Sequence, residues 1–188
     1  MSVTQQRLIW LAKTGDREAF SELVSLFESK VYRAAFALSG NEHDAKDLSQ
    51  ETFIRAFRGI SKFREKSSFF TWLYRILLNV FKNWVKNRRV AVELTETTRA
   101  IVEAGGSASR ATESSEKATE HEKVDRVYRA IYSLPADQKM AIVLHALEAM
   151  TYCEIAKAMG CSIGTVKSRI HAARVALKRE LLRENVEG

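Results

Sequence analysis

The scarcity of turn-forming residues limits what this chain can fold into. Its 188 residues contain one proline, Pro135, and eight glycines, whereas all-β sandwiches and barrels need frequent tight turns. Valine, isoleucine and threonine never alternate with polar residues over the length of a strand, as half-buried strands require. Apolar residues recur instead three and four positions apart, which is the spacing of one helix face. The sequence therefore predicts an all-α protein.

Capping residues place the first helices. A short helix is expected over residues 4–13, and Asp16 can cap a second one that Gly40 ends. A third helix opens at Asn41 or at His43–Asp44. Three or four helices that share one apolar side form a compact bundle.

The stretch 61–89 combines aromatic and basic side chains. Ser67 or Ser68 can cap a helix that begins at Phe69. We expect its core face to hold Phe69, Leu73, Ile76, Val80 and Trp84, and its polar face to hold Thr71, Arg75, Asn79, Lys82 and Lys86. Aromatic rings beside cations suit unpaired nucleic acid, because bases stack on rings and phosphates attract cations. The same pattern is also explained by core packing beneath a solvated basic face.

Composition changes after Val92. Residues 93–123 contain no aromatic residue and hold 7 Asp and Glu against 4 Lys and Arg, which is the composition of a flexible linker. Residues 1–92 hold 16 Lys and Arg against 9 acids, and residues 124–188 hold 10 against 7. Two basic modules thus flank an acidic linker, and a basic surplus favours a polyanion as partner.

The second module has the spacing of a helix-turn-helix. Thr151 and Glu154 can form the capping box of a short helix, Gly160 lies at the turn, and Ser162 or Gly164 opens a longer helix. We expect the second module to bury Val124, Val127, Ile131, Leu134, Val166, Ile170, Ala173 and Leu177. The opposite side of the longer helix would then present polar and basic residues to the major groove. A helical hairpin that serves protein contacts is the alternative.

Several classes of function find no support in the sequence. The two cysteines, Cys153 and Cys161, form neither a disulfide framework nor a paired zinc motif, and we expect both to be small buried side chains in a reducing compartment. The sequence shows no nucleophile–base pair and no glycine loop of the kind that binds phosphate. We therefore predict that the protein is not an enzyme and binds no cofactor or metal. The N-terminus is too polar for a signal peptide and no apolar run could span a membrane, which predicts a cytoplasmic protein.

Three segments together resemble the extracytoplasmic-function (ECF, group IV) sigma factors of the sigma-70 family of bacterial RNA polymerase. They are D-L-S-Q-E-T-F at 47–53, F-T-W-L-Y-R-I at 70–76, and E-I-A followed by G-T-V-K-S-R within 154–169. The resemblance implies two small helical domains, σ2 over residues 1–92 and σ4 over residues 124–188, joined by the linker 93–123. It implies a subunit that binds core polymerase and directs promoter-specific initiation without itself catalysing a reaction.

The resemblance also implies partners and contact residues. The β′ coiled coil and the β flap of core RNA polymerase, promoter DNA and an anti-sigma factor are the expected partners. Residues expected at core polymerase are Asp47, Gln50 and Glu51. Residues expected at the −10 element, where a base leaves the stack, are Phe63, Arg64, Lys66, Ser67, Arg75, Asn79 and Lys82. Residues expected at the −35 element are Thr165, Lys167, Ser168, Arg169, His171 and Arg174, while Ala172 stands where the family commonly has an arginine.

Two other readings compete with this one. A free-standing helix-turn-helix regulator would dimerise on a palindromic site, but the chain shows no additional dimer helix or heptad seam. An adaptor that only sequesters partners would need Asp47 but not Asn79 or Lys167.

Overall fold

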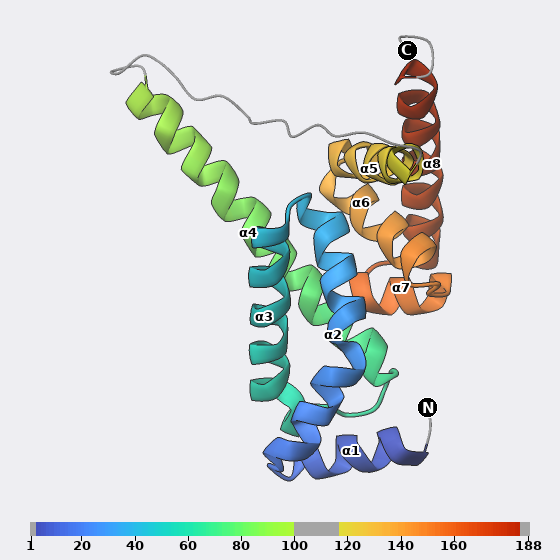
Figure 1. The fold of residues 1–188 in the computed structure, drawn as a ribbon. Helices are drawn as coiled ribbons and strands as arrows, with labels where there is room; N and C mark the ends of the chain where they lie inside the picture. Colours follow the sequence, from blue (N-terminus) through green and yellow to red (C-terminus); the bar gives the residue numbers. More distant parts are fainter. Residues whose placement is uncertain (1–2, 100–116, 185–188) are drawn as a thin grey trace.

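The computed structural model describes residues 3–99 and 117–184, and every regular element in these ranges is helical (Figure 1). This confirms the prediction of an all-α fold. The elements form two groups of helices, α1 to α4 and α5 to α8, which we call the first and the second module. They pack directly against each other.

The first module is a bundle, and capping residues predict the starts of α2, α3 and α4 and the end of α2. Its elements are α1 (Val3–Lys13), α2 (Arg17–Ser39), α3 (Glu42–Gly59), the 3-10 turn η1 (Ile60–Lys62) and α4 (Phe69–Arg99). The Asp16 carboxylate accepts hydrogen bonds from the backbone N–H groups of Glu18 and Ala19 at 2.9 and 3.0 Å. Gly40 adopts a left-handed φ of 82° and ends α2 by donating its N–H to the Phe36 carbonyl.

The second module contains the predicted helix-turn-helix. Its elements are α5 (Lys117–Ser133), α6 (Ala136–Ile142), the π-helical turn η2 (Val143–Leu147), α7 (Tyr152–Met159) and α8 (Ile163–Glu184). The capping box of α7 is present, because Thr151 Oγ1 accepts from the Glu154 N–H and the Glu154 carboxylate accepts from the Thr151 N–H. Gly160 takes the left-handed conformation at the turn, with φ 67°.

The helices extend into the predicted linker from both sides. Helix α4 continues seven residues beyond Val92 to Arg99, and α5 already begins at Lys117. The middle of the predicted linker, residues 100–116, lies outside the described residues.

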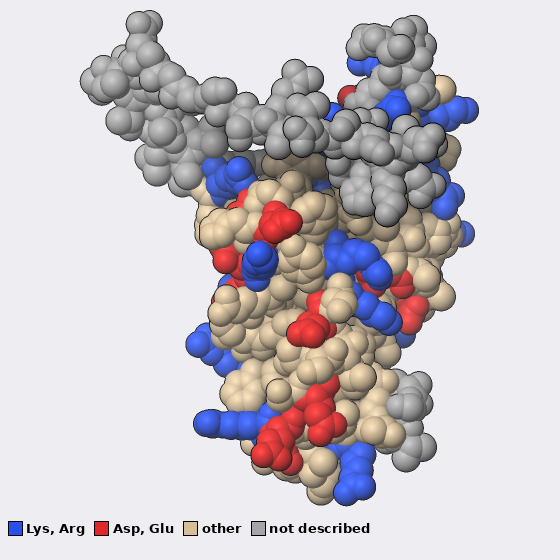
Figure 2. Space-filling view, in the orientation of Figure 1, with Lys and Arg blue, Asp and Glu red and all other residues tan. Residues whose placement is uncertain are grey.

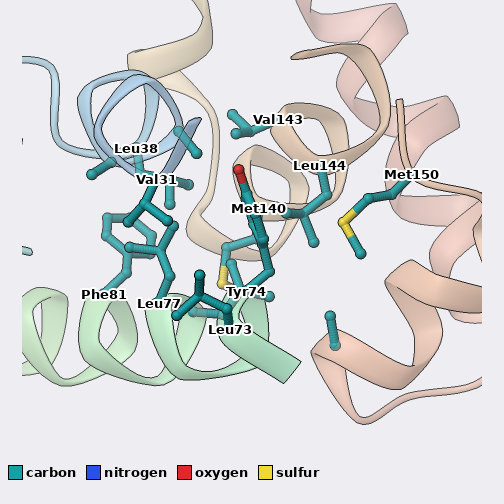
Figure 3. Close-up of a cluster of buried hydrophobic side chains, with 14 of the residues drawn as sticks. Val31, Leu38, Leu73, Tyr74, Leu77, Phe81, Met140, Val143, Leu144 and Met150 are labelled. Atoms are coloured by element: carbon teal, nitrogen blue, oxygen red, sulfur yellow. The ribbon is translucent and has the colours of Figure 1, made fainter. Parts of the chain in front are cut away.

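Helix α4 lies at the centre of the molecule and is buried on two sides. The predicted core residues Phe69, Leu73 and Val80 are buried, while Ile76 and Trp84 are half-buried. A second set of α4 side chains that the sequence analysis did not assign to the core is equally buried: Tyr74, Leu77, Leu78 and Phe81. Three of these four, Tyr74, Leu77 and Phe81, join α2 and the second module in one apolar cluster (Figure 3). One helix therefore serves the cores of both modules.

Four sequence predictions about exposure were wrong. Thr71 is buried rather than on the polar face of α4, because its hydroxyl turns inward to the Ser68 hydroxyl at 2.8 Å. Val124 and Val127 are 53% and 43% exposed, since α5 packs on α2 and α8 through its C-terminal half. Cys153 is exposed near the start of α7, whereas Cys161 is half-buried.

Candidate nucleic-acid interface

The loop between η1 and α4 has an aromatic floor. Phe63 is only 3% exposed, and its ring packs against the rings of Phe69 and Trp72 with centroids 5.8 and 5.1 Å away. Arg64 and Lys66 project into solvent above it. Phe63 thus supports the loop from beneath, and the atoms of the loop available to a ligand are those of its basic and serine residues.

Two contacts hold this loop in a defined shape. Ser68 Oγ accepts a hydrogen bond from the Thr71 N–H at 3.1 Å and so caps α4. Lys13 Nζ on α1 lies 2.9 Å from Glu65 Oε1, and Glu65 adopts a left-handed φ of 57° that side-chain-bearing residues rarely occupy. The sequence analysis missed this ion pair because its partners are 52 positions apart. Ser67, the remaining predicted residue of the loop, is half-buried.

The polar face of α4 continues from the loop. Arg75, Asn79 and Lys82 are all exposed and follow one another at intervals of four and three residues. Side chains at that spacing are neighbours on a helix surface. The face can offer two cations and one amide group to the same ligand.

The helix-turn-helix presents its predicted residues in two different ways. Four of the six candidates are freely exposed along α8, namely Lys167, Ser168, His171 and Arg174. Thr165 is half-buried, and its hydroxyl lies 2.8 Å from the Ser162 hydroxyl at the start of the helix. Residues Thr165 to His171 lie on the N-terminal turns of α8, which is the part of a recognition helix that reaches base edges, whereas Arg174 lies near the middle of the helix.

Arg169 is engaged within the second module. Its guanidinium forms an ion pair with Asp137 on α6 and contacts Cys161 Sγ at 3.6 Å, and its side chain is 25% exposed. The sequence placed it among free cations at the flank of the recognition helix. In the structure it links α8 to α6.

One of the predicted polymerase-contacting residues, Gln50, lines an apolar groove on α2 and α3. Asp47 and Gln50 are exposed, and Glu51 is half-buried and paired with Arg55 at 2.6 Å. Gln50 lies between two adjoining hollows of ≈ 500 and ≈ 660 Å³. Apolar side chains that line them are Phe20, Val24, Phe53, Ile54 and Phe57. An apolar groove beside carboxylates suits a protein partner better than DNA.

One face of the molecule carries charges of both signs. On the face shown in Figure 2, basic and acidic side chains alternate, and acidic ones gather over its lower part. This face is therefore not uniformly basic.

Two further classes of site are not seen in the described part of the chain. Residues 3–99 and 117–184 hold no group of three or more histidine, cysteine or acidic side chains placed to bind a metal ion. Nor is any described helix both long and apolar enough to cross a membrane.

These features define a class: a helical protein of two modules that joins a basic loop with an aromatic floor to a helix-turn-helix.

Residues 23–90 match the family described as Sigma-70 region 2, and residues 125–177 match the one described as Sigma-70, region 4. The ECF RNA polymerase sigma-E factor of Escherichia coli K12 is 37% identical over 184 residues, covering 95% of either chain. The sigma-E factor of Haemophilus influenzae is 36% identical over 182 residues, covering 95% of this chain and 96% of its own. The chain therefore belongs to the ECF sigma factors of the sigma-70 family.

Solved structures agree with this assignment. CnrH in complex with the cytosolic domain of CnrY matches 95% of this chain and 97% of its own with a TM-score of 0.69 at 24% identity, which supports the fold. The sigma factor RpoE of Bartonella quintana, solved in complex with the anti-sigma factor NepR, matches with a TM-score of 0.64 at 27% identity. That match covers 86% of this chain and 96% of the RpoE chain.

Proposed function

We propose that this chain binds core RNA polymerase and directs promoter-specific initiation in the cytoplasm. The first module captures the melted −10 element, and the second module reads the −35 duplex. The observation that carries the proposal is that this chain combines two surfaces. One is a basic loop with an aromatic floor, and the other is the exposed polar face of the longer helix in a helix-turn-helix. Unpaired bases and a duplex groove call for these two different surfaces.

The −10 surface is the loop Arg64–Ser68 together with Arg75, Asn79 and Lys82. Extruding a base costs a few kcal/mol, which a fitted pocket and phosphate contacts can offset. The buried Phe63 ring keeps the loop raised, while Asn79 can hydrogen-bond to a base edge. The −35 surface is the outer face of α8, where Lys167, Ser168 and their neighbours reach base edges and phosphates.

The decisive experiment is transcription with purified core polymerase and a pool of genomic DNA fragments. We expect promoter-dependent transcripts that start at a shared sequence motif. Their absence, alongside an active control sigma factor, would contradict the proposal. So would tight operator binding by a dimer of the chain without polymerase.

Two substitutions separate the surfaces of the first module. Asn79→Ala should slow open-complex formation, followed by a fluorescent base analogue at the −10 element, while core affinity stays unchanged. Glu51→Lys should weaken core binding, measured by competition, because it reverses a charge beside the apolar groove. Each variant is the control for the other, and equal loss of core affinity in both would refute the division into two surfaces.

We further propose that an anti-sigma factor binds the groove between the modules. This groove of ≈ 640 Å³ is lined by Phe81, Trp84 and Val85 of α4 and by residues 132–136 of the second module. Its mixture of aromatic walls and the nearby Arg88 guanidinium suits the apolar face of a helix that carries acidic residues. The complex of the related Bartonella sigma factor with an anti-sigma factor supports a partner of this kind. Trp84→Ala should weaken binding of that anti-sigma factor, measured with the purified partner, without lowering transcription in its absence.

A further inference from the structure

The loop of the −10 surface is anchored at both ends but has a single polar contact in its middle. Phe63, before the loop, is buried on the aromatic floor, and Ser68 at its end caps α4. The three residues Arg64–Lys66 between these anchors are exposed. Within the described part of the chain, they make one hydrogen bond or ion pair, which joins Glu65 Oε1 to Lys13 Nζ on α1 at 2.9 Å.

Glu65 makes this contact from a backbone conformation that glutamate rarely adopts. Its φ of 57° is left-handed, where a Cβ atom crowds the backbone and glycine would be accommodated without that cost. Such conformations persist where surrounding contacts enforce them, and they cluster at sites that hold ligands. The ion pair with Lys13 is the contact of the Glu65 side chain that can enforce this one.

The same ion pair determines where the negative charge of the loop points. Glu65 is the one acidic residue among residues 61–68, which hold three basic residues. An unpaired carboxylate at this place would repel the phosphates of a bound strand. In the structure the carboxylate lies against the Lys13 ammonium, whose side chain is 26% exposed. Arg64 and Lys66 have no ion-pair partner among the described residues, so both remain available to phosphates.

We propose that Lys13 is a positioning residue for recognition of the −10 element. By holding Glu65 against α1, it fixes the shape of the loop and withdraws the carboxylate from the path of the DNA. Helix α1 packs on η1 directly before the loop, so Lys13 acts from a fixed support. A loop that has its binding shape in advance loses less entropy on binding and favours the base that fits that shape. The inference rests on the proposed function, because it concerns how this loop selects a base.

Substitutions separate the two effects of the ion pair. Lys13→Met leaves an unpaired carboxylate on a released loop, so affinity for −10 DNA and discrimination among bases at the extruded position should each fall about two- to fivefold, the range for an exposed ion pair. Adding Glu65→Gln should restore the affinity but not the discrimination. The exchanged pair, Lys13→Glu with Glu65→Lys, should restore the discrimination. Arg7→Met removes a cation from an exposed position of the same helix and is the matched control.

The hold on the loop can be measured on the full chain without polymerase. Trypsin cleaves after exposed arginine and lysine, and the loop offers Arg64 and Lys66. Because cleavage requires the backbone to open locally, limited digestion followed by mass spectrometry should show faster cleavage at these two sites in Lys13→Met. Arg7→Met should match the parent protein. Equal cleavage rates in Lys13→Met and the parent would show that the ion pair does not hold the loop.

The selection of bases is measured with holoenzyme assembled from purified core polymerase. The probe is fork-junction DNA that carries the shared promoter motif, with each base in turn at the extruded position, and Kd values are compared at one salt concentration. Affinity for core polymerase should be the same in every variant. An unchanged ratio of Kd values between the best and the worst base in Lys13→Met would refute the positioning role. An equal loss of discrimination in Arg7→Met would refute the specific pairing with Glu65.

The two measurements also separate this inference from the proposed function. If the parent holoenzyme shows no preference for the promoter motif, the proposed function fails, whereas the trypsin result still decides whether Lys13 holds the loop. If the parent holoenzyme selects the motif and Lys13→Met selects it equally well, only the positioning role of Lys13 fails.

Discussion

Replacing Lys139 by methionine should stabilise the protein and remove part of its response to pH. Burial lowers the pKa of Lys139 from its ordinary 10.5 to about 8. The unfolded chain therefore binds this proton more tightly than the folded chain. Folding carries the full cost of discharging or burying the ammonium below about pH 8, and the cost declines as the pH rises toward 10.5. Stability should therefore increase with pH in this window.

The size of the effect follows from the same two pKa values. Lowering the pKa from 10.5 to about 8 corresponds to at most about 3 kcal/mol at pH 7. Methionine fills a similar volume without charge. It loses the 3.4 Å hydrogen bond to the Leu38 carbonyl and the stacking on Tyr132, together about 1–2 kcal/mol. The net gain should be about 1–2 kcal/mol, or about 5 °C in Tm for a chain of this size.

Urea unfolding followed by far-UV circular dichroism at pH 7 and pH 9 measures both quantities. The parent protein should gain about 1 kcal/mol over this range from Lys139 alone. The difference between parent and Lys139→Met should shrink by that amount as the pH rises. Lys157→Met, at an exposed lysine on α7, is the control and should leave the pH response unchanged. A difference that stays constant or grows from pH 7 to pH 9 would refute the reasoning.

Other substitutions probe features of the fold and of the −35 reader. Gly40→Ala should cost about 1–2 kcal/mol of unfolding free energy, because residue 40 has φ 82° and no room beside Tyr132; Tyr132→Ala in the same chain should restore the steric part. Lys167→Ala should weaken binding to −35 duplex and reduce the slope of log K against log salt by about one, if the lysine neutralises a phosphate. Asp137→Asn should weaken binding to the −35 duplex a few-fold and leave the slope of log K against log salt unchanged, because it releases Arg169 from α6 without removing a cation. An altered slope would show that Arg169 itself contacts a phosphate.

Local signals in the sequence were enough to predict the helices. Asp16, Gly40, Thr151 and Gly160 determine helix ends through hydrogen bonds to their own backbone neighbourhood or through a left-handed φ. Such contacts span only a few residues, so a pattern in the chain is sufficient to locate them. Many residues of the outer faces of α3, α4 and α8, such as Asp47, Asn79 and Lys167, are likewise exposed where helical periodicity places them.

Contacts between the modules could not be predicted in this way. Helical periodicity gave α4 one core face, yet Tyr74, Leu77 and Phe81 are buried on another because a segment about 70 residues further along covers them. The engagement of Arg169 by Asp137, 32 positions away, is of the same kind. A helical wheel shows which face of a helix is most hydrophobic, but it does not show how many other helices pack against it. The three consecutive apolar residues at 76–78 were the one sequence feature that indicated more than one buried face on α4.

Two sulfur atoms lie within the contact between the modules. Met140 and Met150 are 0% and 2% exposed, and both belong to the apolar cluster that α2, α4 and the second module share (Figure 3). Peroxide converts accessible methionine to a polar sulfoxide, which fits poorly into an apolar contact. We expect oxidation of these two residues to proceed at a rate set by how often the modules part, which mass spectrometry can follow. Once these methionines are oxidised, the two modules would pack together less well. A brief exposure to peroxide would therefore leave the modules apart after the peroxide is gone.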